Sequence, residues 1–297
     1  MYATGECILR ILLTGGSGDL GSILLPSLAT THDVINVDIQ SREADTNKFV
    51  QGSILDRELL DRTFKQIDYI VHIAAWHGIH QVRNEKSAFD FWDLNVTGTF
   101  NVFETAVRNH VKGIVNISST SVDEWPDLYG ASKVLNEEIA RTYAARHALP
   151  VITLRPRAFI PYWNKTVYKN YIEWAQWYWK GAVHIDDVAQ AVIKSLDLLI
   201  SRSDLPDNLT LVVDGAYEYT LNDLARWDEK GPGSTFKRHY PEHVALVADH
   251  GLDPGVKPSI LDMETTISWL GYTPRYSLQN LLEELAQFGE AGPPIPH

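Results

Sequence analysis

Short apolar runs alternate along the chain with longer segments in which apolar residues recur at helical spacing. The runs predict buried strands at residues 8–14, 33–38, 49–54, 68–75, 113–118 and 209–214. The longer segments predict helices at residues 20–28, 57–65, 89–109, 129–147 and 188–200. Strands that alternate with helices form right-handed βαβ units, so the pattern predicts an α/β fold with a doubly wound parallel sheet.

The first predicted strand leads into a glycine-rich stretch, TGGSGDLG, from Thr14 to Gly21. Two glycine registers fit a dinucleotide-binding loop: Gly16, Gly18 and Gly21, or Gly15, Gly18 and Gly21 after Thr14. Glycine lets the backbone approach a pyrophosphate, and the following helix supplies N–H groups to it. The alternative is a strand-to-helix turn that binds nothing. We predict a cofactor cradle made by Gly15, Ser17, Gly18, Asp19, Leu20 and Gly21.

An acidic residue ends the second predicted strand. Asp38 follows the glycines at about the ~20-residue offset where a carboxylate binds the adenosine ribose. A 2′-phosphate would be repelled there, so Asp38 favours NAD, although Arg42 leaves partial room for NADP. A turn residue that merely closes the strand is the alternative. After the fourth strand, the small residues Ala74 and Ala75 would let the cofactor lie close.

Candidate catalytic residues follow the predicted strand 113–118. Tyr129 and Lys133 are four residues apart on a predicted helix, so their side chains share one face. A free tyrosine titrates near ~10, and a neighbouring ammonium favours its phenolate form. Thr120 would hydrogen-bond the reacting oxygen and orient it toward Tyr129. A YxxxK pair alone also occurs by chance on surface helices, but here it follows a glycine cradle and alternating strands.

Composition narrows the classes of molecule that the protein could bind. A net charge of −12 and a pI near 5.3 disfavour nucleic-acid binding, which needs clustered Lys and Arg. No apolar run is long enough for a membrane span and no signal-peptide pattern is present, so we expect a cytoplasmic protein. The single cysteine, Cys7, excludes an internal disulfide and a cysteine-built metal site.

Together these motifs resemble the extended short-chain dehydrogenase/reductase family, which contains NAD-dependent epimerases, dehydratases and sugar dehydrogenases. The resemblance covers nearly the whole chain, in TGGSGDLG, INVD, VHIAA, DLNVTGTFNV, NISST, YGASK, ITLRP, VHIDDVAQA and WLGYTPRYSLQNLLEEL. It implies a Rossmann-type NAD-binding domain in residues 1–155, completed by about residues 185–213. A smaller, interleaved substrate-binding portion would then occupy residues 156–297.

The resemblance also implies roles for individual residues. Gly15, Gly18 and Gly21 would bind the pyrophosphate, and Asp38 the ribose. Thr120 and Tyr129 would be catalytic, while Lys133 would serve both ribose and tyrosine. Ser53, Ile54 and Pro156 complete the expected cofactor site, with Ser53 a weaker acceptor than the Asp usual in relatives. Family members commonly form homodimers through helices that correspond to residues 93–109 and 129–147.

Departures from the family pattern bear on the substrate. Nucleotide-sugar enzymes usually carry an Asn three residues after the arginine of the LRP strand, where this chain has Ala158. Dehydratases carry Asp and Glu directly after the threonine, whereas Thr120 precedes Ser121 and Val122. Only eight residues separate Thr120 from Tyr129, a short loop for this family. These departures favour a small sugar, sugar acid or similar alcohol and disfavour dehydration.

Several residues are candidates for substrate contact, each with a structural alternative. His77 and His80 follow the fourth strand on the nicotinamide side, and we expect no metal because no third ligand is evident. Arg157 would pair with a carboxylate or phosphate, or else form an ion pair within the protein. Trp174 belongs to an aromatic segment, residues 162–179, whose helical spacing favours packing over stacking on a sugar.

Three functional classes remain open from the sequence. The first is an NAD-dependent dehydrogenase of a small sugar, sugar acid or similar alcohol. The second is a nucleotide-sugar epimerase that retains NAD. The third is a non-catalytic NAD-sensing protein, which would not need all three of Thr120, Tyr129 and Lys133.

Overall fold

The computed structural model describes residues 8–41, 48–123 and 127–295, so Cys7 and Arg42 lie outside the described residues. The chain forms two compact units. The first contains residues 1–156 and 189–211, and the second contains residues 157–188 and 212–297.

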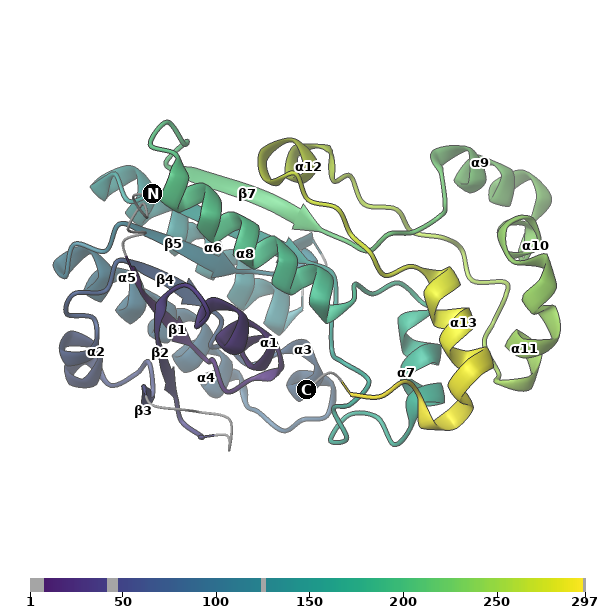
Figure 1. Ribbon diagram of the computed structural model, residues 1–297, viewed down its shortest axis with the longest axis horizontal. Helices are drawn as coiled ribbons and strands as arrows, with labels where there is room; N and C mark the ends of the chain where they lie inside the picture. Colours follow the sequence, from purple (N-terminus) through teal and green to yellow (C-terminus); the bar gives the residue numbers. More distant parts are fainter. Residues whose placement is uncertain (1–7, 42–47, 124–126, 296–297) are drawn as a thin grey trace, which may run out of the picture. The chain divides into compact units, whose positions relative to one another are not determined.

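A seven-stranded sheet, in the order β3-β2-β1-β4-β5-β6-β7, organises the first unit (Figure 1). Its strands are β1 (Arg10–Thr14), β2 (Asp33–Asp38), β3 (Phe49–Gln51), β4 (Tyr69–His72), β5 (Gly113–Ile117), β6 (Val151–Pro156) and β7 (Asn208–Val213). Every pairing from β3 to β6 is parallel, with Ile11 opposite both Val34 and Tyr69. The reversal of strand order beside β1 confirms the predicted doubly wound α/β fold.

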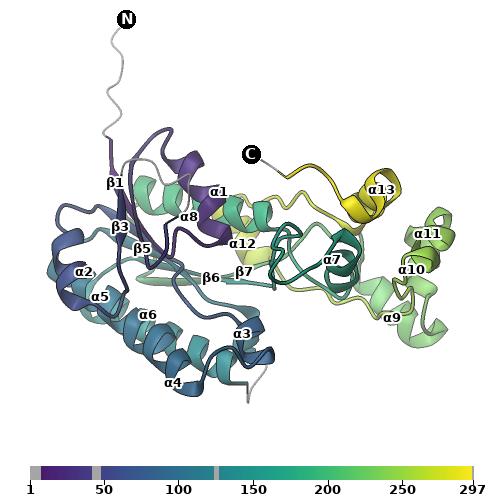
Figure 2. The ribbon, with the colours of Figure 1, turned by 90° about the horizontal axis from the view of Figure 1, so that it is seen from below.

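Helices cover both faces of this sheet. They are α1 (Asp19–Leu28), α2 (Arg57–Thr63), α3 (Gly78–Val82), α4 (Ala88–Phe91), the π-helix η1 (Trp92–Gly98), α5 (Thr99–Arg108), the 3-10 turn η2 (Thr120–Asp123), α6 (Leu128–His147) and α8 (Ile185–Ser201). Figure 2 shows α1 and α8 on one face, with α2, α5 and α6 on the other. Because both faces are covered, the central strands are buried on both sides, which explains their continuous apolar runs.

The predicted helix at residues 89–109 differs from the structure in one respect. It is divided into α4, η1 and α5, because the seven residues of η1 adopt the wider π-helical winding. Such insertions cannot be read from apolar spacing, since they shift the helical phase by one residue. Among the described residues, no helix is both long and apolar enough to cross a membrane.

The second unit has an aromatic core. Its helical elements are α7 (Tyr171–Tyr178), α9 (Leu221–Lys230), α10 (Ser234–His239), η3 (Pro241–His243), α11 (Val244–Asp249), α12 (Glu264–Leu270), α13 (Leu278–Phe288) and η4 (Gly289–Ala291). Tyr171, Trp174 and Tyr178 of α7 are almost completely buried, with ring centroids of neighbours about 5 Å apart. The helical spacing of these aromatic residues thus reflects packing.

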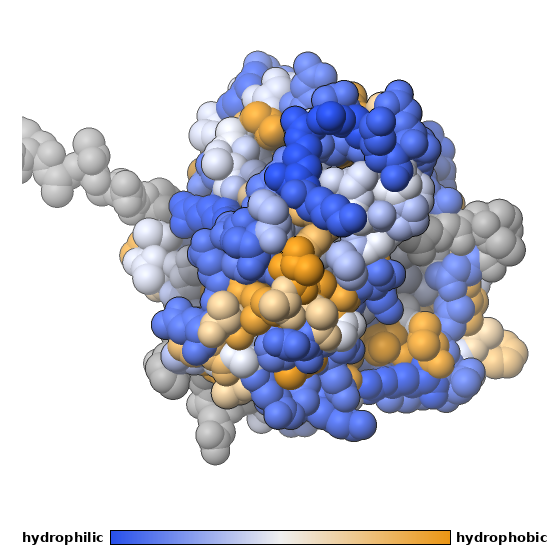
Figure 3. All heavy atoms as spheres, turned by 90° about the vertical axis from the view of Figure 1, so that its right-hand side faces the viewer, coloured by the Kyte–Doolittle hydropathy of each residue, from blue (hydrophilic) through white to orange (hydrophobic). Residues whose placement is uncertain are grey.

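Apolar side chains also remain on the surface of this unit. Leu221 begins α9 and Val244 begins α11, and both are exposed. Figure 3 views the side that carries α9, α10 and α11, and it shows hydrophobic residues grouped within a mainly hydrophilic surface.

Asp187 lies directly before the helix predicted at residues 188–200, where an N-cap would be expected. Asp187 does not cap a helix, because α8 begins two residues earlier; its carboxylate instead accepts the backbone N–H groups of Arg275 and Tyr276. The hydroxyl of Tyr162 donates to the carbonyl oxygens of Pro293 and Pro294, although residues 296–297 lie outside the description.

Candidate active site

Two glycines shape the loop between β1 and α1. Gly15 has a φ of +74°, and a β-carbon there would lie 2.7 Å from the backbone nitrogen of Ala74. At Gly21, a β-carbon would lie 2.2 Å from the carbonyl oxygen of Gly16. Neither position has room for a side chain. The loop therefore makes one tight turn against the segment that follows β4.

The N-terminus of α1 fits a pyrophosphate. Its N-cap is Gly18, which carries no side chain to accept the first helical N–H groups. Those groups begin at Asp19 and Leu20 and carry the positive end of the helix dipole. A tight glycine turn that leads into an uncapped ten-residue helix is suited to a dinucleotide phosphate.

Asp38 lies against this loop from the end of β2. Its Oδ2 accepts a hydrogen bond of 3.0 Å from the backbone nitrogen of Ser17. The hydroxyl of Ser17 in turn accepts 3.0 Å from Nδ2 of Asn36 on the same strand. The carboxylate thus stands beside the glycine turn, where the ribose of a dinucleotide would be recognised.

The remaining predicted cofactor residues occupy the ends of neighbouring strands. Ser53 follows β3, and its hydroxyl accepts from the backbone nitrogen of Leu55. Ile54 is buried and Pro156 ends β6, while Ala74 and Ala75 are half-buried after β4. The carboxyl ends of parallel strands are where doubly wound sheets bind ligands.

Tyr129 and Lys133 meet on α6. The Nζ of Lys133 lies 5.9 Å from the ring centroid of Tyr129 and donates 2.8 Å to the carbonyl oxygen of Ile117. Lys133 is only 3% exposed. Burial lowers its pKa to about 8, and the nearby Glu137 carboxylate opposes that shift. The structure therefore brings a half-buried phenol and a buried amine together at the end of β5.

Thr120 begins η2, and only Ser118 and Ser119 separate it from the end of β5. The following residue, Ser121, packs against α6 so closely that a β-carbon on Gly130 would lie 2.3 Å from its carbonyl oxygen. Gly130 is next to Tyr129. The segment that carries Thr120 is thus adjacent to the first turn of α6.

The loop after β4 lies beside Tyr129 and Lys133. His77 is the N-cap of α3, and its backbone nitrogen donates 3.0 Å to Nδ1 of His80. Burial lowers the pKa of His77 to about 4, helped by the charge of Lys133 and by His80. His77 is therefore neutral at pH 7. Among the described residues, no group of three His, Cys, Asp or Glu side chains is arranged to hold a metal.

A buried polar network beneath the site was not evident from the sequence. Nδ1 of His72 lies 2.7 Å from the hydroxyl of Thr14, and its Nε2 lies 3.0 Å from that of Thr99. The hydroxyl of Thr99 donates to the carbonyl oxygen of Asn95, so it accepts from His72 and from Asn136. His72 is therefore neutral with its proton on Nε2, which agrees with burial lowering its pKa to about 3. The network joins β1, β4, α5 and α6.

Arg157 and Trp174 belong to the second unit, whereas the other predicted site residues belong to the first. Nη2 of Arg157 donates 2.7 Å to Asp214 and 3.2 Å to the carbonyl oxygen of Ser259. The indole nitrogen of Trp174 donates 2.9 Å to the carbonyl oxygen of Ile160. These contacts give both side chains internal partners, and substrate contact remains a prediction for each.

Known structures share this fold. One is a UDP-glucose 4-epimerase with UDP-glucose from Thermotoga maritima, with a TM-score of 0.67 at 20% identity over 93% of this chain and 96% of that one. Another, a dTDP-glucose 4,6-dehydratase double mutant from Streptomyces venezuelae with NAD bound, has a TM-score of 0.66 at 22% identity, covering 94% of this chain and 98% of that one. At these identities the likeness concerns the fold alone.

Sequence comparison adds the family. An L-arabinose 1-dehydrogenase (NAD(P)(+)) of Haloferax volcanii is 30% identical over 49% of this chain and 65% of its own length. A dTDP-glucose 4,6-dehydratase of Streptomyces niveus is 26% identical over 94% of this chain and 92% of its own length. The profile of the NAD dependent epimerase/dehydratase family matches residues 11–166. With its glycine loop, parallel sheet and Tyr129–Lys133 pair, the chain belongs to the NAD dependent epimerase/dehydratase family and is an NAD-dependent enzyme.

Proposed function

We propose that the protein is an oxidoreductase that interconverts a hydroxyl and a keto group on a small sugar, sugar acid or similar alcohol. The observation that carries this proposal is the pairing of Tyr129 with the buried Lys133 at the end of β5. A phenol beside a buried cation is equipped to exchange a proton with a substrate hydroxyl.

Each residue has a distinct role in this proposal. NAD, when bound, supplies the redox chemistry by accepting or returning a hydride. Gly15, Gly18 and Gly21 would hold its pyrophosphate, and Asp38 its adenosine ribose. Tyr129 would take the proton of the reacting hydroxyl during oxidation and return it during reduction. Lys133 would hold the nicotinamide ribose and keep its charge beside the phenol.

The surroundings of Tyr129 would orient the substrate. Thr120 would donate a hydrogen bond to the reacting oxygen, since its segment packs against the start of α6. His77 would offer a neutral hydrogen-bonding ring, because burial and Lys133 keep it unprotonated at pH 7. Neutral side chains at these positions suit hydroxyl groups better than a charged diphosphate.

A small substrate is also supported by the sequence departures and by the relatives. Ala158 stands where nucleotide-sugar enzymes usually carry an Asn, and the loop before Tyr129 is short. One relative is an L-arabinose 1-dehydrogenase, and another, 24% identical over 51% of this chain, is a uronate dehydrogenase of Pseudomonas syringae. The name of the first gives a sugar as its substrate, and the name of the second gives a sugar acid.

A nucleotide-sugar epimerase with retained NAD is the second candidate. It is favoured by the extent of the similarity to nucleotide-sugar enzymes, since the 26% identical dTDP-glucose dehydratase matches along 94% of this chain. An epimerase regenerates its NAD in each turnover, whereas a dehydrogenase releases NADH. The two candidates are therefore separated by whether NADH accumulates.

The test follows NADH absorbance with L-arabinose, D-galacturonate, D-glucuronate and simple alcohols, alongside an isomerisation assay on UDP- and dTDP-sugars. We expect NADH to form with a small substrate, and we expect Tyr129→Phe to abolish this NADH formation. Tyr143→Phe is the matched control, because Tyr143 lies on the same helix but hydrogen-bonds Glu104. Epimerisation of a nucleotide sugar, with no reaction of any small alcohol, would establish the second candidate instead.

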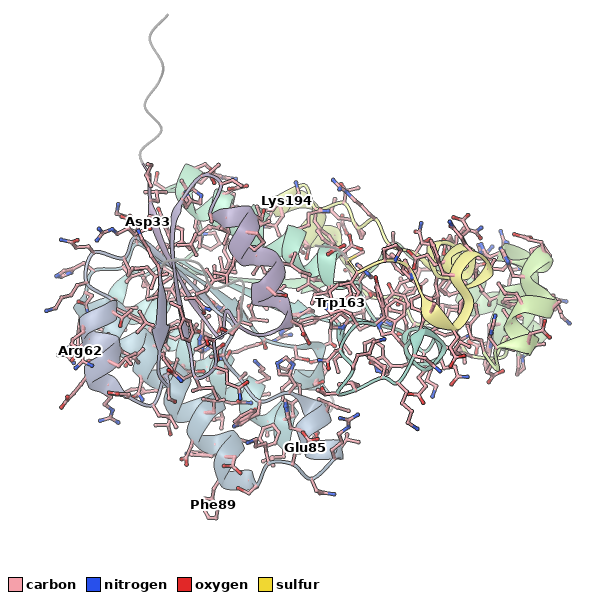
Figure 4. All side chains as sticks on the ribbon, turned by 60° about the horizontal axis from the view of Figure 1, so that its bottom comes forward. Asp33, Arg62, Glu85, Phe89, Trp163 and Lys194 are labelled. Carbon is pink, nitrogen blue, oxygen red and sulfur yellow. The ribbon has the colours of Figure 1, made fainter. Side chains whose placement is uncertain are left out.

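We further propose a homodimer through α5 and α6, the helices predicted at residues 93–109 and 129–147. Trp92, Phe100 and Val134 are exposed on η1, α5 and α6, and Phe89 just before them is 82% exposed. Figure 4 shows Phe89 pointing away from the ribbon. Sedimentation of Phe100→Asp should give a monomer where the wild type gives a dimer. A wild type that sediments as a monomer at micromolar concentration would contradict the proposal.

A further inference from the structure

The first turn of α6 depends on a residue from another helix. The first N–H groups of any helix lack partners within it. Asp127, the N-cap, accepts from the backbone nitrogen of Gly130 at 2.8 Å. The backbone nitrogen of Tyr129 instead donates 2.8 Å to Oε1 of Gln81, which lies on α3.

The same carboxamide also contacts the cap. Nε2 of Gln81 donates 2.6 Å to Oδ1 of Asp127. Gln81 therefore joins the N-cap carboxylate to the backbone of Tyr129, with one atom donating and the other accepting. Glutamate would lack the donor, and lysine or arginine would lack the acceptor.

The helix that carries Gln81 is itself held in place. Oδ1 of Asn95 accepts from the backbone nitrogen of Trp76 at 2.7 Å, and its Nδ2 donates to the carbonyl oxygen of Trp76 at 3.0 Å. Asn95 also donates 2.9 Å to the hydroxyl of Ser132, which donates to the carbonyl oxygen of Tyr129. A β-carbon on Gly78 would lie 3.3 Å from the ring of Tyr129. The segment that leads into α3 is thus hydrogen-bonded through Asn95 and Ser132 to α6.

We propose that Gln81 is a positioning residue for Tyr129. Its carboxamide fixes the backbone of the first turn of α6, so that the phenol stays in register with Lys133, one turn further along the helix. The NAD-binding loop is built from different elements and does not depend on this contact. The inference rests on the proposed function only for its kinetic test.

The first test replaces Gln81 with alanine and uses Val82→Ala as the matched control, since Val82 is 77% exposed on the same helix. Hydrogen exchange of the amides in residues 128–133 reports the contact without any substrate. We expect at least about tenfold faster exchange in Gln81→Ala and wild-type exchange in Val82→Ala. Wild-type exchange in Gln81→Ala would overturn the proposal.

The kinetic test uses whichever small sugar or nucleotide sugar the wild type converts. A displaced catalytic group typically lowers the rate by about 10²-fold. We therefore expect Gln81→Ala to lower kcat by about 10- to 100-fold while the KM for NAD stays within about twofold. An unchanged kcat would overturn the positioning role. A wild type inactive on every probe would instead contradict the proposed function, and the exchange test would still decide this inference.

Charge variants separate positioning from general destabilisation. In Gln81→Glu, the new carboxylate faces the carboxylate of Asp127, and protonation of either one restores a hydrogen-bond donor. We therefore expect the kcat of this variant, relative to that of the wild type, to rise as the pH falls from 8 toward 5. Adding Asp127→Asn supplies an amide donor opposite Glu and keeps a capping side chain. We expect this double variant to recover at least about half of the wild-type kcat at pH 7.5. A double variant no better than Gln81→Glu would overturn the proposal.

Discussion

The amine of Lys133 donates a 2.8 Å hydrogen bond to the carbonyl oxygen of Ile117, the last residue of β5. This bond anchors a side chain that is 97% removed from solvent and whose pKa falls from 10.5 to about 8. Burying a lysine in its charged form opposes folding. The site therefore contains a group that is retained at the expense of stability.

Replacing Lys133 should separate stability from activity. Between pH 8 and 10.5 the unfolded chain binds the lysine proton more strongly than the folded one, so the penalty is full below about pH 8 and disappears as the pH approaches 10.5. It amounts to about 3 kcal/mol before the hydrogen bond to Ile117 is counted. We expect Lys133→Met to abolish turnover and to match or exceed the wild type in urea unfolding at pH 7. A variant that unfolds far more easily at pH 7 but retains activity would contradict this expectation.

Asp38 should govern the choice of cofactor. The wild type should bind NAD more tightly than NADP, because the carboxylate repels a 2′-phosphate. Asp38→Ala should erase most of that difference and weaken NAD binding by about tenfold, since the ribose and the backbone of Ser17 lose their acceptor. Calorimetry measures both affinities, with Asp33→Ala, at the other end of β2, as the control. Tighter NADP binding by the wild type would refute the role of Asp38.

His72 should make the protein sensitive to acid. The unfolded chain protonates this histidine near pH 6.5, and the folded chain only near pH 3, so stability falls as the pH drops through that interval. The full loss is about 5 kcal/mol, because each pKa unit is worth about 1.4 kcal/mol. His72→Gln keeps a donor and an acceptor but does not titrate, so its stability should vary less between pH 6.5 and 4. Urea unfolding at several pH values measures this, with the exposed His147→Gln as the control.

Arg157 tests a structural role against a substrate-binding one. Burial raises the pKa of Asp214 to about 6, although Arg157 lowers it. Arg157→Met leaves that carboxylate unpaired, and we expect a loss of about 3–5 kcal/mol at pH 8. The loss should shrink as the pH falls and the carboxyl group is protonated. Wild-type stability, with a KM raised for D-galacturonate but not for L-arabinose, would show instead that Arg157 binds substrate.

Local sequence patterns were sufficient to predict the central strands and the glycine loop of the first unit. The apolar runs at β1, β2, β4 and β5 and the glycines before α1 are dictated by neighbours in the sequence. Gly15 is required because its β-carbon would strike Ala74, and such a constraint leaves a recognisable motif. The pairing of Tyr129 with Lys133 follows from one helical turn.

Contacts between distant segments could not be predicted in this way. Gln81 meets Tyr129 across 48 residues of sequence, and Asn95 meets Ser132 across 37. Glutamine and asparagine are common surface residues, and nothing in their sequence surroundings marks these two as hydrogen-bond partners of α6. Arg157 likewise finds Asp214 only because β6 and β7 lie side by side in the sheet.

The π-helical winding of η1 acts as a single-residue insertion within an otherwise α-helical segment. Each residue of an α-helix advances the side-chain direction by about 100°, so deleting one residue between Asn95 and Thr99 would rotate Asn95 and everything before it relative to α5 by that angle. Thr99 would keep its place in the buried network, while Asn95 would turn away from Trp76. The extra residue thus lets one continuous helical segment direct Asn95 toward the loop after β4 and Thr99 toward the sheet.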